Sequence, residues 1–373
     1  RLSLSKLTLP TYFFGERKLR SPFFFVTLHR IKLTNTKMQE IDYSSLDFGY
    51  HPTDYIVRCT WSNGTWSEVE AITEFTFPIH VSAACLHYGQ LAFEGMKAYR
   101  CADGHVRIFR PDFNGERMQR SCRALAMPEL PIDRFIEMVE QVVRLNERHV
   151  PPYGTGASLY IRPVMIATTP QIGVHAAHDY LFFILTSPVG AYFKGGFQSN
   201  PYVITRDFDR AAPKGTGRFK VAANYAGSLL CHRLAVEQGY SSEMYLDSKE
   251  HKYIDEAGAA NFFGIKNGVY VTPQSDSVLP SVTNDSLVTI ARDLGIKVER
   301  RQIPVEELAE MQEAGACGTG AVIVPIERID DPAMNRSYVF GEPGPVTCQL
   351  YKALTAIQLG EAEDKHGWTR IVI

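Results

Sequence analysis

Residues 211–227 read AAPKGTGRFKVAANYAG, and Lys220 is the residue of this stretch that points to a chemistry. A glycine-rich run ends at this lysine, and Tyr225 follows five positions later. The residues after Lys220 are small or apolar, so we expect them to be buried. Burial disfavours the ammonium form and leaves a nucleophilic amine, which a bond to an aldehyde requires. The alternative is an ordinary lysine at the end of a strand, with its stem packed and its charge in solvent.

Composition excludes several classes of protein. The chain has 373 residues, of which 45% are hydrophobic and 21% charged, as in a soluble globular protein long enough for two domains. Its net charge of −2 gives no reason to expect nucleic acid or a membrane as a partner. The seven cysteines are scattered without a C-x-x-C pair, so neither disulfides nor a metal site are expected. A reducing cytoplasm fits best.

The first 37 residues differ from the rest. They are rich in Lys and Arg, contain Glu16 as their acid, and end just before Met38. We expect 1–37 to be a non-native or disordered extension upstream of a start at Met38, or else a basic targeting segment. The apolar run 22–28 is too short to span a bilayer.

Strand and helix patterns alternate over residues 38–190, which predicts a small α/β domain. The segment CADGHVRIF predicts a hairpin that turns at Asp103-Gly104, and 132–150 has the period of an amphipathic helix. Two long β-rich runs follow, and Arg162 stands alone among apolar residues in the first. A buried arginine needs an anion, so Arg162 is expected in a structural ion pair or at a ligand.

Paired glycines and polar residues predict an interdomain connector over 191–205, followed by a large second domain over 206–373. Within it we expect a strand pair that turns at Asn267-Gly268, a helix over 282–294 that stops at Gly295, and a helix after Pro304. Further strands are expected at PYVITR (201–206) and SEMYLDS (242–248).

Seven strings carry a resemblance to a known family. They are CLHYGQLAFEGMKAYR (85–100), ERMQR (116–120), LYIRP (159–163), FKVAANYAGSLL (219–230), IDEAGAANFFGI (254–265), LPSVTNDS (279–286) and ACGTGAV (316–322). Together they resemble the branched-chain amino acid aminotransferases of bacterial type, in the fold-type-IV pyridoxal-phosphate class, from about Ile41 onward. The resemblance implies an α/β (α+β) fold with a smaller N-terminal α/β domain and a larger C-terminal pseudo-barrel domain.

The resemblance also implies an activity. It is reversible, ping-pong amino transfer between L-leucine, L-isoleucine or L-valine and 2-oxoglutarate, with pyridoxal 5'-phosphate as cofactor, in a cytoplasmic homodimer. Alternatives within the fold are a D-amino acid aminotransferase, an aminodeoxychorismate-lyase-like enzyme and a non-catalytic cofactor-binding protein. The strings LHYGQ…FEG and YIRP favour the branched-chain enzymes.

By resemblance, Lys220 is the catalytic residue that bonds to the cofactor aldehyde and moves a proton. Glu256 matches the carboxylate that faces the pyridine nitrogen; the adjacent Asp255 is the alternative. Tyr225 matches the donor to the ring hydroxyl, with a core tyrosine as the alternative. Arg210 matches a position near the cofactor with no assigned role.

The phosphate is expected among donors from three segments. Arg120 and Thr319 match family positions, and Val282 and Thr283 open a helix whose free N–H groups favour an anion. An ordinary N-cap threonine is the competing interpretation of Thr283.

Substrate contacts also follow from the resemblance. The backbone of Thr319 and Gly320 would hold the α-carboxylate, and Tyr160 and Arg162 would bind the distal carboxylate of glutamate. The apolar wall would be formed by Tyr88, Phe93, Tyr192 and Tyr225.

Overall fold

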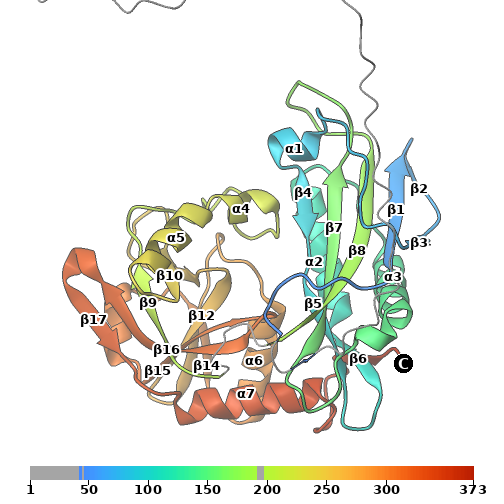
Figure 1. Ribbon diagram of the computed structural model, residues 1–373. Helices are drawn as coiled ribbons and strands as arrows, with labels where there is room; N and C mark the ends of the chain where they lie inside the picture. The colour runs from blue at the N-terminus through green and yellow to red at the C-terminus, as the bar shows by residue number, and fades with distance from the viewer. Residues whose placement is uncertain (1–41, 44–45, 191–196) are drawn as a thin grey trace, which may run out of the picture. The chain divides into compact units, whose positions relative to one another are not determined.

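The computed structural model describes residues 42–43, 46–190 and 197–373 (Figure 1). The predictions for 1–37 and for Tyr192 lie outside the described residues. The described part of 42–373 forms one unit with two sheets.

The first sheet is antiparallel throughout, with nine strands in the order β18-β6-β5-β7-β8-β1-β2, β3 beside β1 and β4 beside β7. Its central strands β7 and β8 pair along their whole length, which confirms the two long β-rich runs. The strands are β1 (Ile56–Ser62), β2 (Thr65–Trp66), β3 (Glu70–Ile72), β4 (Leu91–Phe93), β5 (Met96–Arg100), β6 (Val106–Phe109), β7 (Ser158–Ala167), β8 (Tyr180–Val189) and β18 (Thr369–Ile371).

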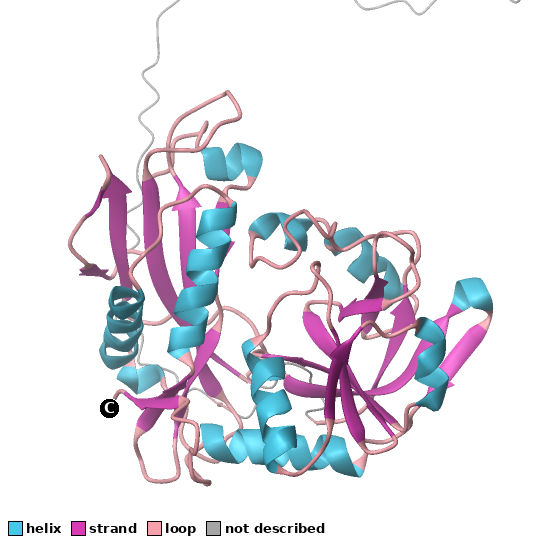
Figure 2. Ribbon diagram, turned by 180° about the vertical axis from the view of Figure 1, so that it is seen from behind, coloured by secondary structure: helices cyan, strands magenta, loops and turns pink. Residues whose placement is uncertain are grey.

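Two helices, α2 (Pro111–Ala124) and α3 (Ile132–Leu145), cover one face of this sheet (Figure 2). The predicted amphipathic helix is confirmed as far as Leu145, because Phe135 and Val139 face the sheet and are buried. A short 3-10 turn, Glu147–His149, takes up the rest of the predicted span. A further short helix, α1 (Ala84–Tyr88), precedes β4.

The predicted hairpin is β5–β6, in which Arg100 pairs with Val106. Its turn contains Gly104 at φ 85°, a left-handed conformation that glycine adopts without a steric cost. This hairpin carries Lys97 and Tyr99 toward the second sheet.

The second sheet closes on itself. Its strands follow the order β11-β10-β9-β16-β15-β12, and β12 pairs again with β11, so six strands form a barrel; β13 and β14 extend it beside β12, and β17 beside β16. The expected pseudo-barrel is therefore confirmed. The strands are β9 (Asn200–Ile204), β10 (Ser242–Leu246), β11 (Ile254–Ala257), β12 (Ala260–Lys266), β13 (Val269–Pro273), β14 (Val298–Arg301), β15 (Glu313–Gly318), β16 (Val322–Asp331) and β17 (Arg336–Val339).

Helices pack outside the barrel: α4 (Ala222–Ala226), α5 (Leu229–Glu237), α6 (Val282–Asp293) and α7 (Pro345–Gln358). The helix predicted at 282–294 is confirmed, and Gly295 follows it at φ 75°. Its N-cap is Ser281, whose hydroxyl accepts the N–H of Asn284, so the N-cap interpretation of Thr283 is wrong. The helix expected after Pro304 is a 3-10 helix, Val305–Glu310.

The two sheets share a core. Tyr99 and Phe109 from the β5–β6 hairpin pack with Leu287 of α6 and Leu354 of α7 in one buried cluster. The predicted connector 191–205 includes β9, and the C-terminal β18 returns to pair with β6 of the first sheet. The proposed domain boundaries stay predictions.

All seven cysteines are free. Among the helices of the described residues, none combines the length and the apolar character that crossing a membrane requires.

Candidate active site

Lys220 lies where the second half of the chain meets β4. Its N–H donates to Ser121 Oγ of α2 at 2.9 Å, and its C=O accepts the N–H of Phe93 at 3.1 Å. Val221 then makes a β-bridge with Ala92. The backbone of Lys220 is therefore fixed on both sides before α4 begins.

The burial expected after Lys220 is only partly right. Val221 is fully buried, but Lys220 is half-buried and Ala223 is exposed. The reason is local: the chain turns into the single-turn helix α4 at Ala222, and a short surface helix leaves one face in solvent.

Two aromatic rings surround the amine of Lys220. Nζ donates to the hydroxyl of Tyr225 at 2.7 Å and lies 4.7 Å from the centre of the Phe93 ring. The Phe93 and Tyr225 rings meet edge to face at 4.8 Å. The structure thus brings three predicted site residues together, and the hydroxyl of Tyr225 accepts its hydrogen bond from the Lys220 amine.

Glu256 on β11 is 3% exposed. Burial raises the pKa of its carboxyl to about 7, against the lowering effects of Arg210 and of the N–H of Leu279. Oε1 accepts that N–H and lies 3.3 Å from Nη2 of Arg210. The positive charge of Lys220 also lowers the pKa of this carboxyl, as the smallest of these effects.

Asp255, the alternative carboxylate, points to the other face of β11, because neighbouring strand residues alternate. Its Oδ2 accepts the Ser277 hydroxyl at 2.6 Å, whereas its buried Oδ1 has no hydrogen-bond partner among the residues that the structure describes. Arg210 lies between the two acids and donates to the carbonyls of Gly217 and Ser277. The positive charge of Lys220 lowers the pKa of Glu256, whereas Asp255 bonds to Ser277, and Glu256 stays the predicted carboxylate of the site.

The start of α6 and the end of β15 border one small cavity. Val282, Thr283 and Thr319 all line it, and Thr283 is buried. The first N–H groups of a helix have no partner within it, and Ser281 caps only that of Asn284. The start of α6 and Thr319, just after β15, therefore both offer donors to an anion in this cavity.

Arg120 is not brought onto this cavity by the structure. It lies on α2, half-exposed, with Nη1 3.6 Å from Glu116 and its guanidinium over the ring of Phe113. Burial lowers the pKa of this guanidinium, and the neighbouring charge of Arg117 adds to that effect.

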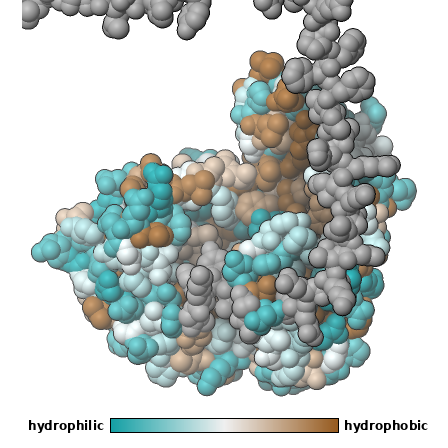
Figure 3. Space-filling model, viewed as in Figure 1, coloured by the Kyte–Doolittle hydropathy of each residue, from teal (hydrophilic) through white to brown (hydrophobic). Residues whose placement is uncertain are grey.

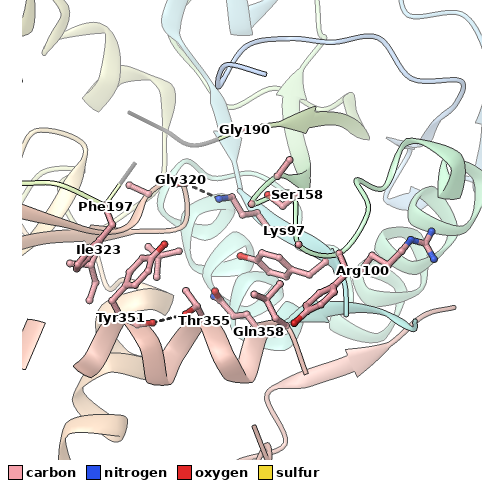
Figure 4. Close-up of a pocket in the computed structure, with 18 of the residues that line it drawn as sticks. Lys97, Arg100, Ser158, Gly190, Phe197, Gly320, Ile323, Tyr351, Thr355 and Gln358 are labelled. Carbon is pink, nitrogen blue, oxygen red and sulfur yellow. Dashed lines mark hydrogen bonds between the residues drawn. The ribbon is translucent and has the colours of Figure 1, made fainter. Parts of the chain in front are cut away.

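Gly320 lies in the turn after β15. Its carbonyl is bound by Lys97, a residue to which the sequence patterns did not point. Lys97 Nζ donates to Gly320 O at 2.7 Å, and both border a cavity of about 350 Å³ (Figure 4). Burial lowers the pKa of Lys97 to about 8. Val322 ends the turn at φ 65°, a strained conformation for a β-branched residue that costs of order 1–3 kcal/mol.

Arg162 on β7 has no carboxylate within ion-pairing distance among the described residues, which speaks against a structural ion pair. Its Nη2 donates to the hydroxyl of Tyr160 at 3.0 Å, its guanidinium lies 4.9 Å from the Phe93 ring, and its buried Nε has no partner. Tyr160 in turn leans over Gly95, where a Cβ would collide with its hydroxyl. Gly95 thus leaves the space that Tyr160 occupies.

Tyr88 does not join this cluster. It is 39% exposed at the end of α1, and its hydroxyl donates to the carbonyl of Ile172. Sequence reasoning also missed Glu94 and Arg117, which form a buried ion pair beside Phe93. Both stand in strings already singled out, FEGMK and ERMQR, but nothing in those strings shows that the two residues meet.

Comparison with known proteins shows the family of this chain. The family described as amino-transferase class IV matches residues 91–329. A branched-chain-amino-acid aminotransferase of Haemophilus influenzae is 46% identical over 89% of this chain and 98% of its own length.

This chain belongs to the class IV aminotransferases, among the branched-chain-amino-acid aminotransferases. The Escherichia coli branched-chain amino acid aminotransferase has a solved structure with a TM-score of 0.74 at 30% identity, covering 86% of this chain and 100% of that one. The branched-chain amino acid aminotransferase from Thermobaculum terrenum, solved in its PLP-form, gives 0.72 at 25% identity, over 86% and 99%.

Proposed function

We propose that this chain, a branched-chain-amino-acid aminotransferase, transfers the amino group between L-leucine, L-isoleucine or L-valine and 2-oxoglutarate at Lys220. The observation that carries the proposal is the hydrogen bond of 2.7 Å between the Lys220 amine and the Tyr225 hydroxyl, beside the Phe93 ring and next to β4. The cofactor we propose is pyridoxal 5'-phosphate.

The residues present fit that cofactor. The aldehyde requires an amine, the pyridine nitrogen a carboxylate and the phosphate a set of donors, and Lys220, Glu256 and the start of α6 offer these. Glu256 is buried with a raised pKa, so a cationic partner would stabilise its charged form. Buried polar atoms of Arg210 and Asp255 without a partner lie beside it. Arg120, beside Glu116, is not among the residues that line the cavity at the start of α6.

When bound, pyridoxal phosphate supplies an electron sink for the bond that breaks at the substrate Cα. Lys220 Nζ would take the proton from the substrate Cα and deliver it to the cofactor carbon. The Tyr225 hydroxyl orients Nζ, and the Phe93 ring limits its approach to one side. Glu256 would face the ring nitrogen and favour its protonated form, while Arg210 and the N–H of Leu279 favour the charged carboxylate.

Two kinds of side chain must enter the same pocket. Phe93 and Tyr225 present an apolar wall to leucine, isoleucine or valine. Arg162 and the hydroxyl of Tyr160 present donors on the same side for the distal carboxylate of glutamate. The N–H groups of Thr319 and Gly320 would hold the α-carboxylate common to both substrates.

Steady-state assays test this proposal. With L-leucine and 2-oxoglutarate, the chain should form glutamate and the branched 2-oxo acid, and reciprocal plots at several 2-oxoglutarate concentrations should be parallel, as ping-pong transfer requires. D-Alanine as the only accepted donor, or intersecting lines, would contradict the proposal.

We also infer a homodimer. Large apolar side chains gather on the tip of the first sheet around α1 (Figure 3), with Val174 85% and Ile172 76% exposed and Leu86 and Tyr88 beside them. A patch of this kind marks an interaction surface. Light scattering should give twice the chain mass for the wild-type protein, and the substitution Leu86→Asp should lower the measured mass.

The seven free thiols suit a cytoplasmic location.

A further inference from the structure

A buried ion pair lies at the junction of the two sheets, outside the residues assigned above. Glu94 follows β4 and is fully buried, and Arg117 on α2 is 4% exposed. Nε and Nη2 of Arg117 donate to the two carboxylate oxygens of Glu94, each at 2.7 Å. Asn114 donates to the same carboxylate at 2.7 Å. The pair is therefore bidentate, and its charges are balanced without solvent.

The third donor of Arg117 reaches the other half of the molecule. Nη1 donates to the carbonyl of Pro280 at 2.9 Å. Pro280 stands between Leu279, whose N–H donates to Glu256, and Ser281, which caps α6. One guanidinium thus anchors the turn on which both the Glu256 carboxylate and the start of α6 depend.

The same face of α2 also holds Lys220. Ser121 is four residues beyond Arg117, and positions four apart lie on one face of a helix. Its Oγ accepts the N–H of Lys220 at 2.9 Å. Ser121 and Arg117 of α2 therefore bind two segments of the site. Ser121 binds the segment that carries the Lys220 amine, and Arg117 binds the turn whose Leu279 N–H donates to the Glu256 carboxylate.

We propose that Glu94 and Arg117 are positioning residues for the reaction. They fix the turn 279–281 against α2 and so set where Glu256 lies relative to Lys220. The inference rests on the proposed function. Stability alone does not require such a pair, since apolar residues of similar volume often serve as well. The bond to Pro280 gives it a use that an apolar pair lacks.

The test is Arg117→Lys. An ammonium keeps the charge opposite Glu94 but lacks the fork that reaches both Glu94 and Pro280. We expect kcat for L-leucine to fall about 10- to 100-fold, the effect of a small misplacement, while KM changes less than about threefold. Affinity for pyridoxal phosphate, titrated by absorbance, should also fall, because the start of α6 shifts.

The acid limb of the kcat–pH profile supplies a readout that a merely structural role would not move. Without its anchor, Leu279 donates less well to Glu256, which favours the protonated carboxyl, so the limb should move to higher pH. The charged groups that shift the pKa of Glu256 are Arg210, Asp255 and Lys220, and the substitution changes none of them.

Arg123→Lys is the matched control, because Arg123 lies on the same helix in an exposed bidentate pair with Glu129. It should behave as wild type. The double variant Glu94→Leu/Arg117→Met removes both charges of the buried pair. It should fold and show the same loss of kcat, so it decides the matter if Arg117→Lys does not fold. A folded variant of either kind with wild-type kcat, acid limb and cofactor affinity would overturn the inference. If wild type itself showed no transfer, the proposed function would fail, while the cofactor titration would still test the pair.

Discussion

Arg162 is a cation with no acidic neighbour among the described residues, and its guanidinium lies against Phe93 and beside the Tyr160 hydroxyl. Leaving such a group in a mostly apolar strand is costly unless a ligand supplies the anion. The sequence already left a ligand contact as one of two alternatives, and the structure removes the support for the other.

The substitution Arg162→Met should therefore separate the two substrates. A hydrogen bond to a charged group contributes roughly 1.5–3 kcal/mol, so KM for L-glutamate should rise about 10- to 100-fold. KM for L-leucine should change little, because leucine has no distal carboxylate. Steady-state kinetics with each donor measure this. Arg58→Met, in an exposed pair with Glu70, is the control, and equal losses for both donors would contradict the assignment.

Lys220→Ala should remove turnover. A positioned acid–base group contributes about 10²- to 10⁴-fold, and this residue also bonds to the cofactor, so kcat should fall at least by that factor. Single-turnover assays on protein loaded with pyridoxal phosphate measure the remaining rate. Lys214→Ala, an exposed lysine in the same stretch, should retain wild-type activity; a Lys220 variant as active as that control would refute the assignment.

At the scale of elements, α2 joins the two halves of the site. The patterns at 132–150 and 282–294 predicted α3 and α6, because each has a clear apolar period or a clear stop. No helical pattern in the sequence predicted α2, because its buried face includes Asn114, Arg117 and Ser121 instead of a continuous apolar stripe. Polar residues are buried there because each bonds to a loop or strand far away in sequence, which no local pattern records.

Ser121→Ala should test the hold of α2 on Lys220. The variant leaves the N–H of Lys220 without its partner, so the free energy of unfolding should fall by about 1–3 kcal/mol. Urea unfolding measures this, and kcat should fall with it. Unchanged stability and kcat would mean that β4 alone fixes this segment.

For the whole molecule, the barrel and the flanking sheet followed from the resemblance, and most strands followed from period and turn residues. The contacts between the two halves did not. Arg117 with Pro280, and Lys97 with Gly320, join residues 163 and 223 positions apart. Such pairs depend on how the sheets pack, whereas Lys220 and Tyr225 are neighbours in sequence and could be recognised together.

Stability without cofactor should depend on pH through Glu256. Its pKa in the folded state, about 7, lies above its ordinary value, so the folded state binds more protons between about pH 4.5 and 7. Stability should therefore be greatest below this window and fall by roughly 3 kcal/mol as pH rises through it. Asp255, with a raised pKa from burial, acts in the same direction. Urea unfolding at several pH values measures the loss. In Glu256→Gln the dependence should be much weaker, and an equally steep one there would assign it to other groups.

The most direct test of the account is a set of half-reactions. The chain is loaded with pyridoxal phosphate, L-leucine, L-glutamate and D-alanine are added separately, and the absorbance of the bound cofactor is followed. The account predicts a change with both L-leucine and L-glutamate and none with D-alanine, because the apolar rings of Phe93 and Tyr225 lie together with the Arg162 guanidinium beside Lys220. A change with D-alanine alone, or with none of the three, would contradict it.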